Sequence, residues 1–165
     1  YKNYPQGKIT VTDFLLGQYY LYEDALNSQE WNIESDSMKV VLGHECQKAT
    51  CSFRGRKWTA WFALDVPVSD GPLKFCGLPG LIMEVYDRGK QYYFCINGMQ
   101  QVSATPITFG ILDKDFKHFQ KTDRKDFLLS KYRYLRNQNS INEASTGISL
   151  GSVDEALKYD LIEKE

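Results

Sequence analysis

The chain has 165 residues, a formal net charge of −1 and 42% hydrophobic residues, which is the composition of one folded soluble domain rather than of a disordered segment. A dedicated nucleic-acid binder normally carries a clear excess of basic residues, so the balanced charge argues against a nucleic-acid partner. No apolar run approaches the roughly 20 residues needed to cross a bilayer, and we expect no transmembrane segment. Aromatic residues make up 14% of the chain and favour a β-rich fold, because aromatic side chains pack well on pleated sheets.

Short apolar stretches in the first 42 residues predict strands. They are separated by polar residues, and a turn is expected between the last two stretches. The predicted strands are Ile9–Val11, Tyr19–Tyr22, Trp31–Glu34 and Met38–Leu42.

A hairpin is predicted at His44–Phe53 and Arg56–Val66, joined by the two-residue loop Arg54-Gly55. The second strand alternates with period 2 and has a strongly apolar face at its even positions. A two-residue loop fixes the register of the two strands. The pairs expected to lie opposite each other are Phe53 and Arg56, Cys51 and Trp58, Ala49 and Ala60, and Lys48 and Trp61.

Residues 67–80 are predicted to form a loop, because Pro and Gly interrupt any strand there. This loop contains Leu73, Phe75 and Leu78, so it should pack against the core rather than extend into solvent. Further strands follow, with turns at 87–90 and at Asn97-Gly98, the latter a typical type I′ hairpin pair. The strands expected are Leu81–Tyr86, Gln91–Ile96, Met99–Ala104 and Ile107–Leu112.

The C-terminal part begins with a helix at Asp123–Arg136, predicted from its capping residue and from an apolar stripe with helical spacing. Residues 138–165 are polar and are expected to form a partly ordered tail. We therefore expect one β domain over residues 1–137 followed by this tail. The fold class is mainly β (α+β): a curved antiparallel meander, half-barrel or sandwich-like, with one C-terminal helix packed on it.

The second face of the predicted hairpin is the first candidate site. It carries His44, Cys46 and Lys48, with Trp61 opposite Lys48. One aromatic among a few polar groups is typical of a binding surface, whereas the simpler interpretation is that a helix or the 67–80 loop covers Trp61. His44 and Cys46 are weak candidates for metal ligands, because a structural zinc site needs four ligands and no second pair is present. No motif for a cofactor is found, and no catalytic residue can be assigned.

Four cysteines are present: Cys46, Cys51, Cys76 and Cys95. Their even number in a small domain allows no, one or two disulfides, and three connectivities if all four pair. The alternative is that they are buried free thiols.

The segment Gly77-Leu78-Pro79-Gly80-Leu81-Ile82 has no side chain that can donate a proton, attack a substrate or bind a metal. Pro79 and Gly80 suit the two central positions of a type II turn, and the following residues enter a strand. A structural role is therefore favoured, and a turn that closes an apolar pocket is the alternative.

This segment resembles the name-giving motif of the GLPGLI family of bacterial proteins. The resemblance covers roughly residues 4–98, and further matching stretches lie on either side of the cysteine at position 46. These stretches are Trp31 and Ile33, Leu42–Ala49, Phe53–Phe62, Val66–Pro72 and Lys74-Phe75.

The resemblance implies an envelope or secreted protein, periplasmic or associated with the outer membrane, whose signal peptide lies outside this sequence. Only Cys46 corresponds to a family cysteine, and extra thiols fit an oxidising compartment. On that basis the expected disulfides are Cys51–Cys76 and Cys46–Cys95. No biochemical activity is implied.

The leading hypothesis is a non-catalytic module that binds an apolar small molecule or a protein partner. Its groove is expected to be lined by Trp61, Lys48, Phe75 and Leu78. One alternative is an enzyme or metal-binding protein that uses the strand face of His44, Cys46 and Lys48. Another is a structural component of an outer-membrane assembly.

Overall fold

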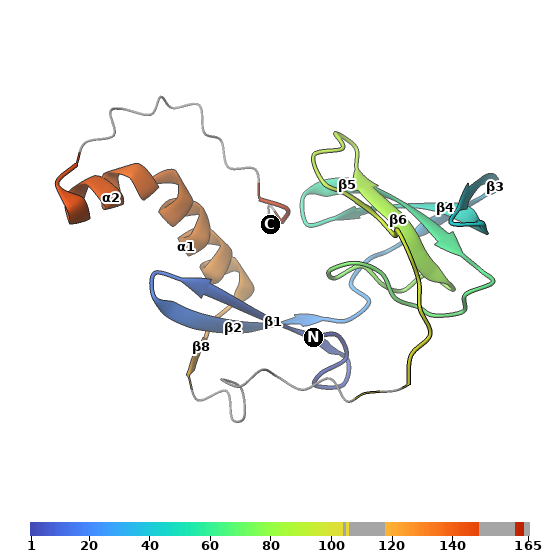
Figure 1. The fold of residues 1–165 in the computed structure, drawn as a ribbon, viewed down its shortest axis with the longest axis horizontal. Helices are drawn as coiled ribbons and strands as arrows, with labels where there is room; N and C mark the ends of the chain where they lie inside the picture. The colour runs from blue at the N-terminus through green and yellow to red at the C-terminus, as the bar shows by residue number, and fades with distance from the viewer. Residues whose placement is uncertain (104, 106–117, 149–160, 164–165) are drawn as a thin grey trace.

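The computed structural model describes residues 1–103, 105, 118–148 and 161–163. The expectation of a mainly β fold is confirmed, with the strands divided between two sheets (Figure 1). A three-stranded sheet has the order β1-β2-β8, and a five-stranded sheet has the order β3-β4-β5-β6-β7. The strands are β1 (Lys8–Leu15), β2 (Gln18–Ala25), β3 (Asn32–Val41), β4 (His44–Phe53), β5 (Arg56–Ala63), β6 (Leu81–Asp87), β7 (Tyr93–Cys95) and β8 (Phe119–Lys121).

The smaller sheet is a hairpin of β1 and β2, to which β8 adds in parallel. Helix α1 (Arg124–Arg136) packs on this sheet, because Phe127 is buried against Leu15 and Tyr22. The helix begins where the sequence predicts it, since the side chain of Asp123 accepts a hydrogen bond from the backbone N–H of Lys125 at 2.7 Å. The smaller sheet and its helix therefore form one packed unit (Figure 1).

The predicted tail begins with a second helix, α2 (Gln138–Thr146), which directly follows α1 and ends at Gly147 in the left-handed conformation. Residues 161–163 then return to the interior, where Glu163 is buried. No helix among the described residues is long and apolar enough to cross a membrane.

The larger sheet is the antiparallel meander expected from the sequence. All four predicted cross-strand pairs of β4 and β5 are present, including Cys51 opposite Trp58 and Lys48 opposite Trp61. The connecting pair Arg54-Gly55 has positive φ at both positions, as a type I′ turn requires. In β3, the turn predicted before Met38 is instead an irregularity within one continuous strand.

The predicted continuation of the meander after Asn97-Gly98 is wrong. The strand β7 ends at Cys95, and residues 96–103 form no strand. Neither Asn97 nor Gly98 has a positive φ, so the pair does not form the type I′ turn that its sequence suggests. The strand expected at Ile107–Leu112 lies outside the described residues.

The loop of residues 67–80 covers one face of the larger sheet, which we call the inner face. Phe75 and Leu78 are buried there against the core, and the ring of Phe75 lies 4.6 Å from that of Trp58. A residue outside the loop also holds it in place, because the indole N–H of Trp31 donates to the carbonyl of Cys76 at 2.8 Å. The apolar residues of the loop therefore pack down, as expected.

The Gly77–Ile82 segment is structural for a different reason than the sequence suggests. Gly80 does not have the positive φ of a type II turn. Instead it passes so close to β5 that a Cβ on Gly80 would lie 2.0 Å from the carbonyl oxygen of Ala63. Gly77 is the residue with positive φ, at 91°. Gly77 thus adopts a backbone conformation that other residues rarely adopt, and Gly80 allows two backbones to approach closely.

Candidate ligand-binding cavity between the sheets

The four residues expected to line one groove lie on opposite faces of the larger sheet. Trp61 and Lys48 point to the outer face, whereas Phe75 and Leu78 pack on the inner face. The reason is the period of the strand, because Trp61 alternates with the inward-facing Ala60 and Phe62. A single groove lined by Trp61, Phe75 and Leu78 is therefore not formed.

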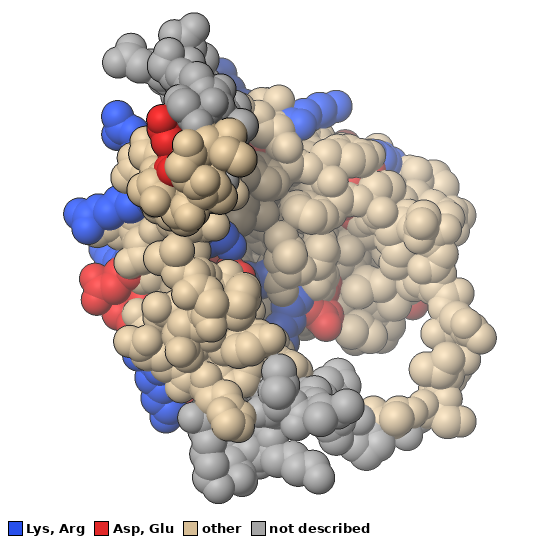
Figure 2. Space-filling model, turned by 60° about the vertical axis from the view of Figure 1, so that its left-hand side comes forward, with Lys and Arg blue, Asp and Glu red and all other residues tan. Residues whose placement is uncertain are grey.

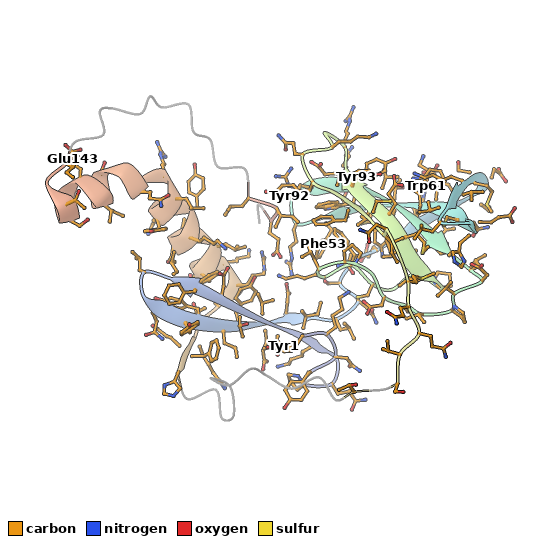
Figure 3. All side chains as sticks on the ribbon, in the orientation of Figure 1. Tyr1, Phe53, Trp61, Tyr92, Tyr93 and Glu143 are labelled. Carbon is orange, nitrogen blue, oxygen red and sulfur yellow. The ribbon has the colours of Figure 1, made fainter. Side chains whose placement is uncertain are left out.

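On the outer face, Trp61 lies among charged side chains of the sheet itself (Figure 3). The ammonium group of Lys39 lies 5.3 Å from the centre of the Trp61 ring and forms an ion pair with the buried carboxylate of Glu84. Lys48 pairs with Glu34 at 2.8 Å. The indole nitrogen of Trp61 is buried and has no hydrogen-bond partner among the described residues. Trp61 is therefore covered by lysine rather than by a helix or the 67–80 loop.

The two weak metal-ligand candidates are engaged in local contacts. The Nδ1 atom of His44 lies 2.7 Å from the carboxylate of Asp65. Cys46 is fully buried, which raises the pKa of its thiol. In the part of the chain that the structure describes, no group of three or more His, Cys, Asp or Glu side chains is placed to hold a metal.

All four cysteines are free thiols, so the two expected disulfides are not formed. For Cys46 and Cys95 the sheet order gives the reason. They lie on β4 and β7, which are separated by β5 and β6, and three strand spacings amount to about 14 Å, well beyond the span of a disulfide. Cys51 lies on the inner face, where burial raises the pKa of its thiol to about 12.

A cavity of about 440 Å³ lies between the two sheets. One wall is formed by the smaller sheet and α1, with Ile9, Val11 and Phe127. The opposite wall is formed by the larger sheet and its loop, with Phe53, Trp58 and Phe75. Of the residues predicted as ligand-binding, Phe75 alone lines this cavity.

Charged side chains gather at one end of the cavity, and we call this set the polar end. Its members are Asp24, Arg54, Lys74, Arg124 and Glu163. Basic and acidic side chains lie side by side in the depression between the two parts of the molecule (Figure 2).

Two carboxylates are shared by three cations at the polar end. Asp24 accepts from Arg54 at 2.6 Å and from Lys74 at 3.1 Å. Glu163 pairs with Lys74 at 2.5 Å and with Arg124 at 3.3 Å. All five side chains are at least 78% buried. The polar end thus holds one more positive than negative charge in a place with little solvent.

The hydroxyl of Tyr22 borders this end of the cavity, 3.4 Å from the ammonium group of Lys74. Burial, together with the nearby carboxylates of Glu163 and Asp24, raises the pKa of Tyr22 above its usual value. Tyr22 therefore stays neutral and is a hydrogen-bond donor at the edge of the apolar cavity.

Sequence reasoning missed most of this site. The polar end joins β2, the β4–β5 turn, the 67–80 loop, α1 and residues 161–163, which lie far apart in the chain. Arg54 was assigned only to a turn, and Glu163 to a polar tail. Nothing in one sequence pairs Lys74 with a residue 89 positions later.

Residues 54–84 match the model of a family described as "Protein of unknown function (Porph_ging)", the GLPGLI family. No curated protein matches the chain significantly. Two solved structures of PNGF-II, in the P21 and C2 space groups, are similar at 17% identity, with TM-scores of 0.47 and 0.44. They cover 74% and 76% of this chain but 22% and 23% of PNGF-II, so this chain spans less than a quarter of those proteins. The family match thus concerns the segment from Arg54 to Glu84, which contains the Gly77–Ile82 motif.

Proposed function

We propose that this chain is a non-catalytic binding module of the cell envelope or of secreted proteins, and that the cavity between its sheets receives the apolar part of a ligand. The observation that carries the proposal is the cavity itself. Its volume of about 440 Å³ falls within the roughly 300–1,000 Å³ of sites for small ligands. The family resemblance supports the location.

The lining of the cavity favours an apolar group over a polar one. Most of the lining is aliphatic or aromatic, and its charged residues are Arg54, Lys74 and Glu163 of the polar end together with the ion pair of Asp13 and Lys131. Burying apolar ligand surface there is worth roughly 25 cal/mol per Å², while the charges at the end fix its orientation. Such a division between an apolar body and a few directed polar groups is common in binding pockets.

The alternative of an enzyme or metal protein built on His44, Cys46 and Lys48 receives less support. His44 and Lys48 are each paired with a carboxylate, and Cys46 is enclosed. A buried thiol with a raised pKa is a poor nucleophile and a poor metal ligand at neutral pH. These contacts favour a structural role for the strand face.

Binding of Nile red, a neutral apolar dye, tests the proposal. We expect saturable binding with a fluorescence increase in the unmodified chain. Val11→Trp fills the cavity from β1 and should weaken binding by about tenfold or more. Val40→Trp makes the same change at an exposed position on β3 and should leave binding unchanged.

Thermal unfolding of both variants shows whether they remain folded. Equal dye binding by the folded Val11→Trp and Val40→Trp variants, or no saturable binding to the unmodified chain, would refute the proposal.

A further inference from the structure

The wall of the cavity includes three residues that come from far along the chain, Leu161, Ile162 and Glu163. Two of their main-chain carbonyls are bound by one arginine, Arg56, at the start of β5. Its Nη2 atom donates to the carbonyl of Leu161 at 2.8 Å, and its Nε atom donates to the carbonyl of Ile162 at 3.1 Å. One guanidinium group thus binds two consecutive main-chain carbonyls.

Contacts with residues outside this segment also hold Arg56 in position. Its Nη1 atom donates to Asp87 and to Gln91, each at 2.9 Å. Its guanidinium also lies 4.7 Å from the centre of the Tyr92 ring, and its side chain is 4% exposed. A buried, oriented guanidinium offers its remaining donors at little entropic cost.

The side chains of the same segment match the two parts of the cavity. Ile162 packs against the inner-face core. The carboxylate of Glu163 enters the polar end, between Lys74 and Arg124, with the Nε atom of Arg54 4.0 Å away. The rest of the chain therefore contacts this segment in three ways: through its main chain, through an apolar side chain and through a carboxylate.

The charge balance shows why a carboxylate is needed there. Glu163 is one of two carboxylates that pair with the three cations of the polar end among the described residues. The Nε atom of Arg54 is also buried without a hydrogen-bond partner among the described residues. A buried cation that loses a counter-charge is destabilised, so removal of Glu163 favours the entry of another carboxylate.

We propose that this part of the cavity is a recognition site for a peptide segment with an apolar residue followed by an acidic one. Residues 161–163 are its occupant within the chain, and a partner's segment of the same chemistry binds by displacing them. This inference rests on the proposed binding function and names the ligand class. The two carbonyl contacts of Arg56 favour a peptide over a lipid carboxylate, which has no such carbonyls to offer.

The test uses a labelled synthetic peptide of residues 159–165 and fluorescence polarisation. In the unmodified chain the internal segment competes at a high effective concentration. The full-length chain with Glu163→Gln has a weakened occupant, so it should bind the peptide about tenfold or more tightly than the unmodified chain. Glu143→Gln, an exposed change on α2, is the matched control and should bind as the unmodified chain does.

Changes in the peptide and in the site test the mode of recognition. A peptide with Gln in place of Glu at position 163 should bind about tenfold more weakly to the Glu163→Gln chain, and a scrambled peptide should not bind. In the same chain, Lys74→Gln should weaken binding, whereas Lys57→Gln on the exposed side of β5 should not. Equal binding of the parent and scrambled peptides would overturn the inference.

Dodecanoate decides between a peptide and a lipid. If it displaces the peptide and binds more tightly, the site recognises an amphiphile and the inference is wrong. If Glu163→Gln fails to fold, hydrogen exchange in the unmodified chain replaces the binding assay. Excess peptide should then speed exchange at the amides of residues 161–163, and unchanged exchange would count against the inference.

The two proposals can fail separately. Nile red binding without peptide binding leaves the apolar cavity as a binding site and removes the peptide. Peptide binding without dye binding supports the peptide site and removes the proposal that the cavity binds a small apolar molecule.

Discussion

The two faces of the larger sheet bury apolar side chains in different ways. The inner face packs against the 67–80 loop, with Phe75 and Leu78 completing its core. The outer face has a smaller buried cluster, against which Trp61 packs, and Lys39 lies over Trp61 and pairs with Glu84. The inner face is thus completed by a long loop, whereas the outer face combines a smaller apolar cluster with an ion pair over its tryptophan.

This difference shows which face is available for function. The inner face is continuous with the cavity, because Phe53, Trp58 and Phe75 belong to both. On the outer face, Trp61, which the sequence predicts as a ligand contact, lies beneath Lys39 and packs against the apolar cluster of that face. A tryptophan among polar residues therefore marks a binding surface only where neighbouring lysines do not already cover it.

The largest effect is expected from Gly80→Ala, which breaks the attachment of the loop that covers the inner face. The new Cβ would meet the backbone of Ala63 at 2.0 Å, and a backbone atom cannot move aside as a flexible side chain does. We expect a loss of about 4 kcal/mol or more in the free energy of unfolding, measured by urea denaturation. Gly98→Ala has open space around it and should change stability little; similar losses in both variants would contradict the close approach.

Substitutions at two neighbouring residues of β5 compare how much each face contributes to the free energy of unfolding. Phe62 is fully buried on the inner face, whereas Trp61 is only partly buried on the outer face. Phe62→Ala should lower the free energy of unfolding by about 3–5 kcal/mol, and Trp61→Ala by about half as much, although it removes more atoms. Urea denaturation of both variants measures this, and an equal or larger loss for Trp61→Ala would show that the outer face is a second core.

The ion pair of the outer face can be broken from one side. Lys39→Met leaves the buried carboxylate of Glu84 without its cation and should cost about 2 kcal/mol in thermal or urea unfolding. The double variant Lys39→Met, Glu84→Gln should recover most of that loss, because the uncompensated charge is gone. Additive losses in the double variant would mean that the two side chains do not act as a pair.

The last prediction concerns pH and the thiol of Cys51 on the inner face. Its pKa is about 12 in the folded chain and 9.0 as the ordinary value, so the unfolded chain loses this proton first. The stabilising contribution is therefore complete below pH 9 and is lost as the pH rises from 9 towards 12, by at most about 1.4 kcal/mol per pH unit. Cys51→Ala should flatten this part of the stability curve, measured by urea denaturation at each pH.

Cys95→Ala removes an exposed thiol from β7 and is the control. Its curve should keep the slope of the unmodified chain. If Cys51→Ala leaves the slope unchanged, the thiol is not enclosed as the structure indicates.

The local parts of the fold could be predicted from the sequence, and the long-range parts could not. The register of β4 and β5 follows from a two-residue turn and a period of 2, and α1 follows from its cap and apolar stripe. The hairpin predicted at Asn97-Gly98 is wrong, because such a pair forms a hairpin turn only where a second strand follows and pairs with the first. The cavity could not be predicted, because it needs the packing of two sheets whose hairpins are compatible with many arrangements.

The polar end shows the same limit at the level of single residues. Arg54 and Lys74 have ordinary local roles, in a turn and in a loop. Their shared contact with Glu163 arises only when three distant segments meet. Conversely, the Gly77–Ile82 motif could be assigned a structural role from its chemistry, but not the backbone contact at Ala63 that requires Gly80.

The contact between Arg56 and Ile162 spans 106 positions in the chain, and this separation has a consequence for protein synthesis. At roughly 5–20 residues per second, Ile162 is added about 5 to 20 s after Arg56. During that interval the growing chain contains Arg56 without the two main-chain carbonyls that it binds in the folded chain, and Lys74 and Arg124 of the polar end are added within the same interval. The polar end therefore receives its last cation, Arg124, only 39 positions before the carboxylate of Glu163.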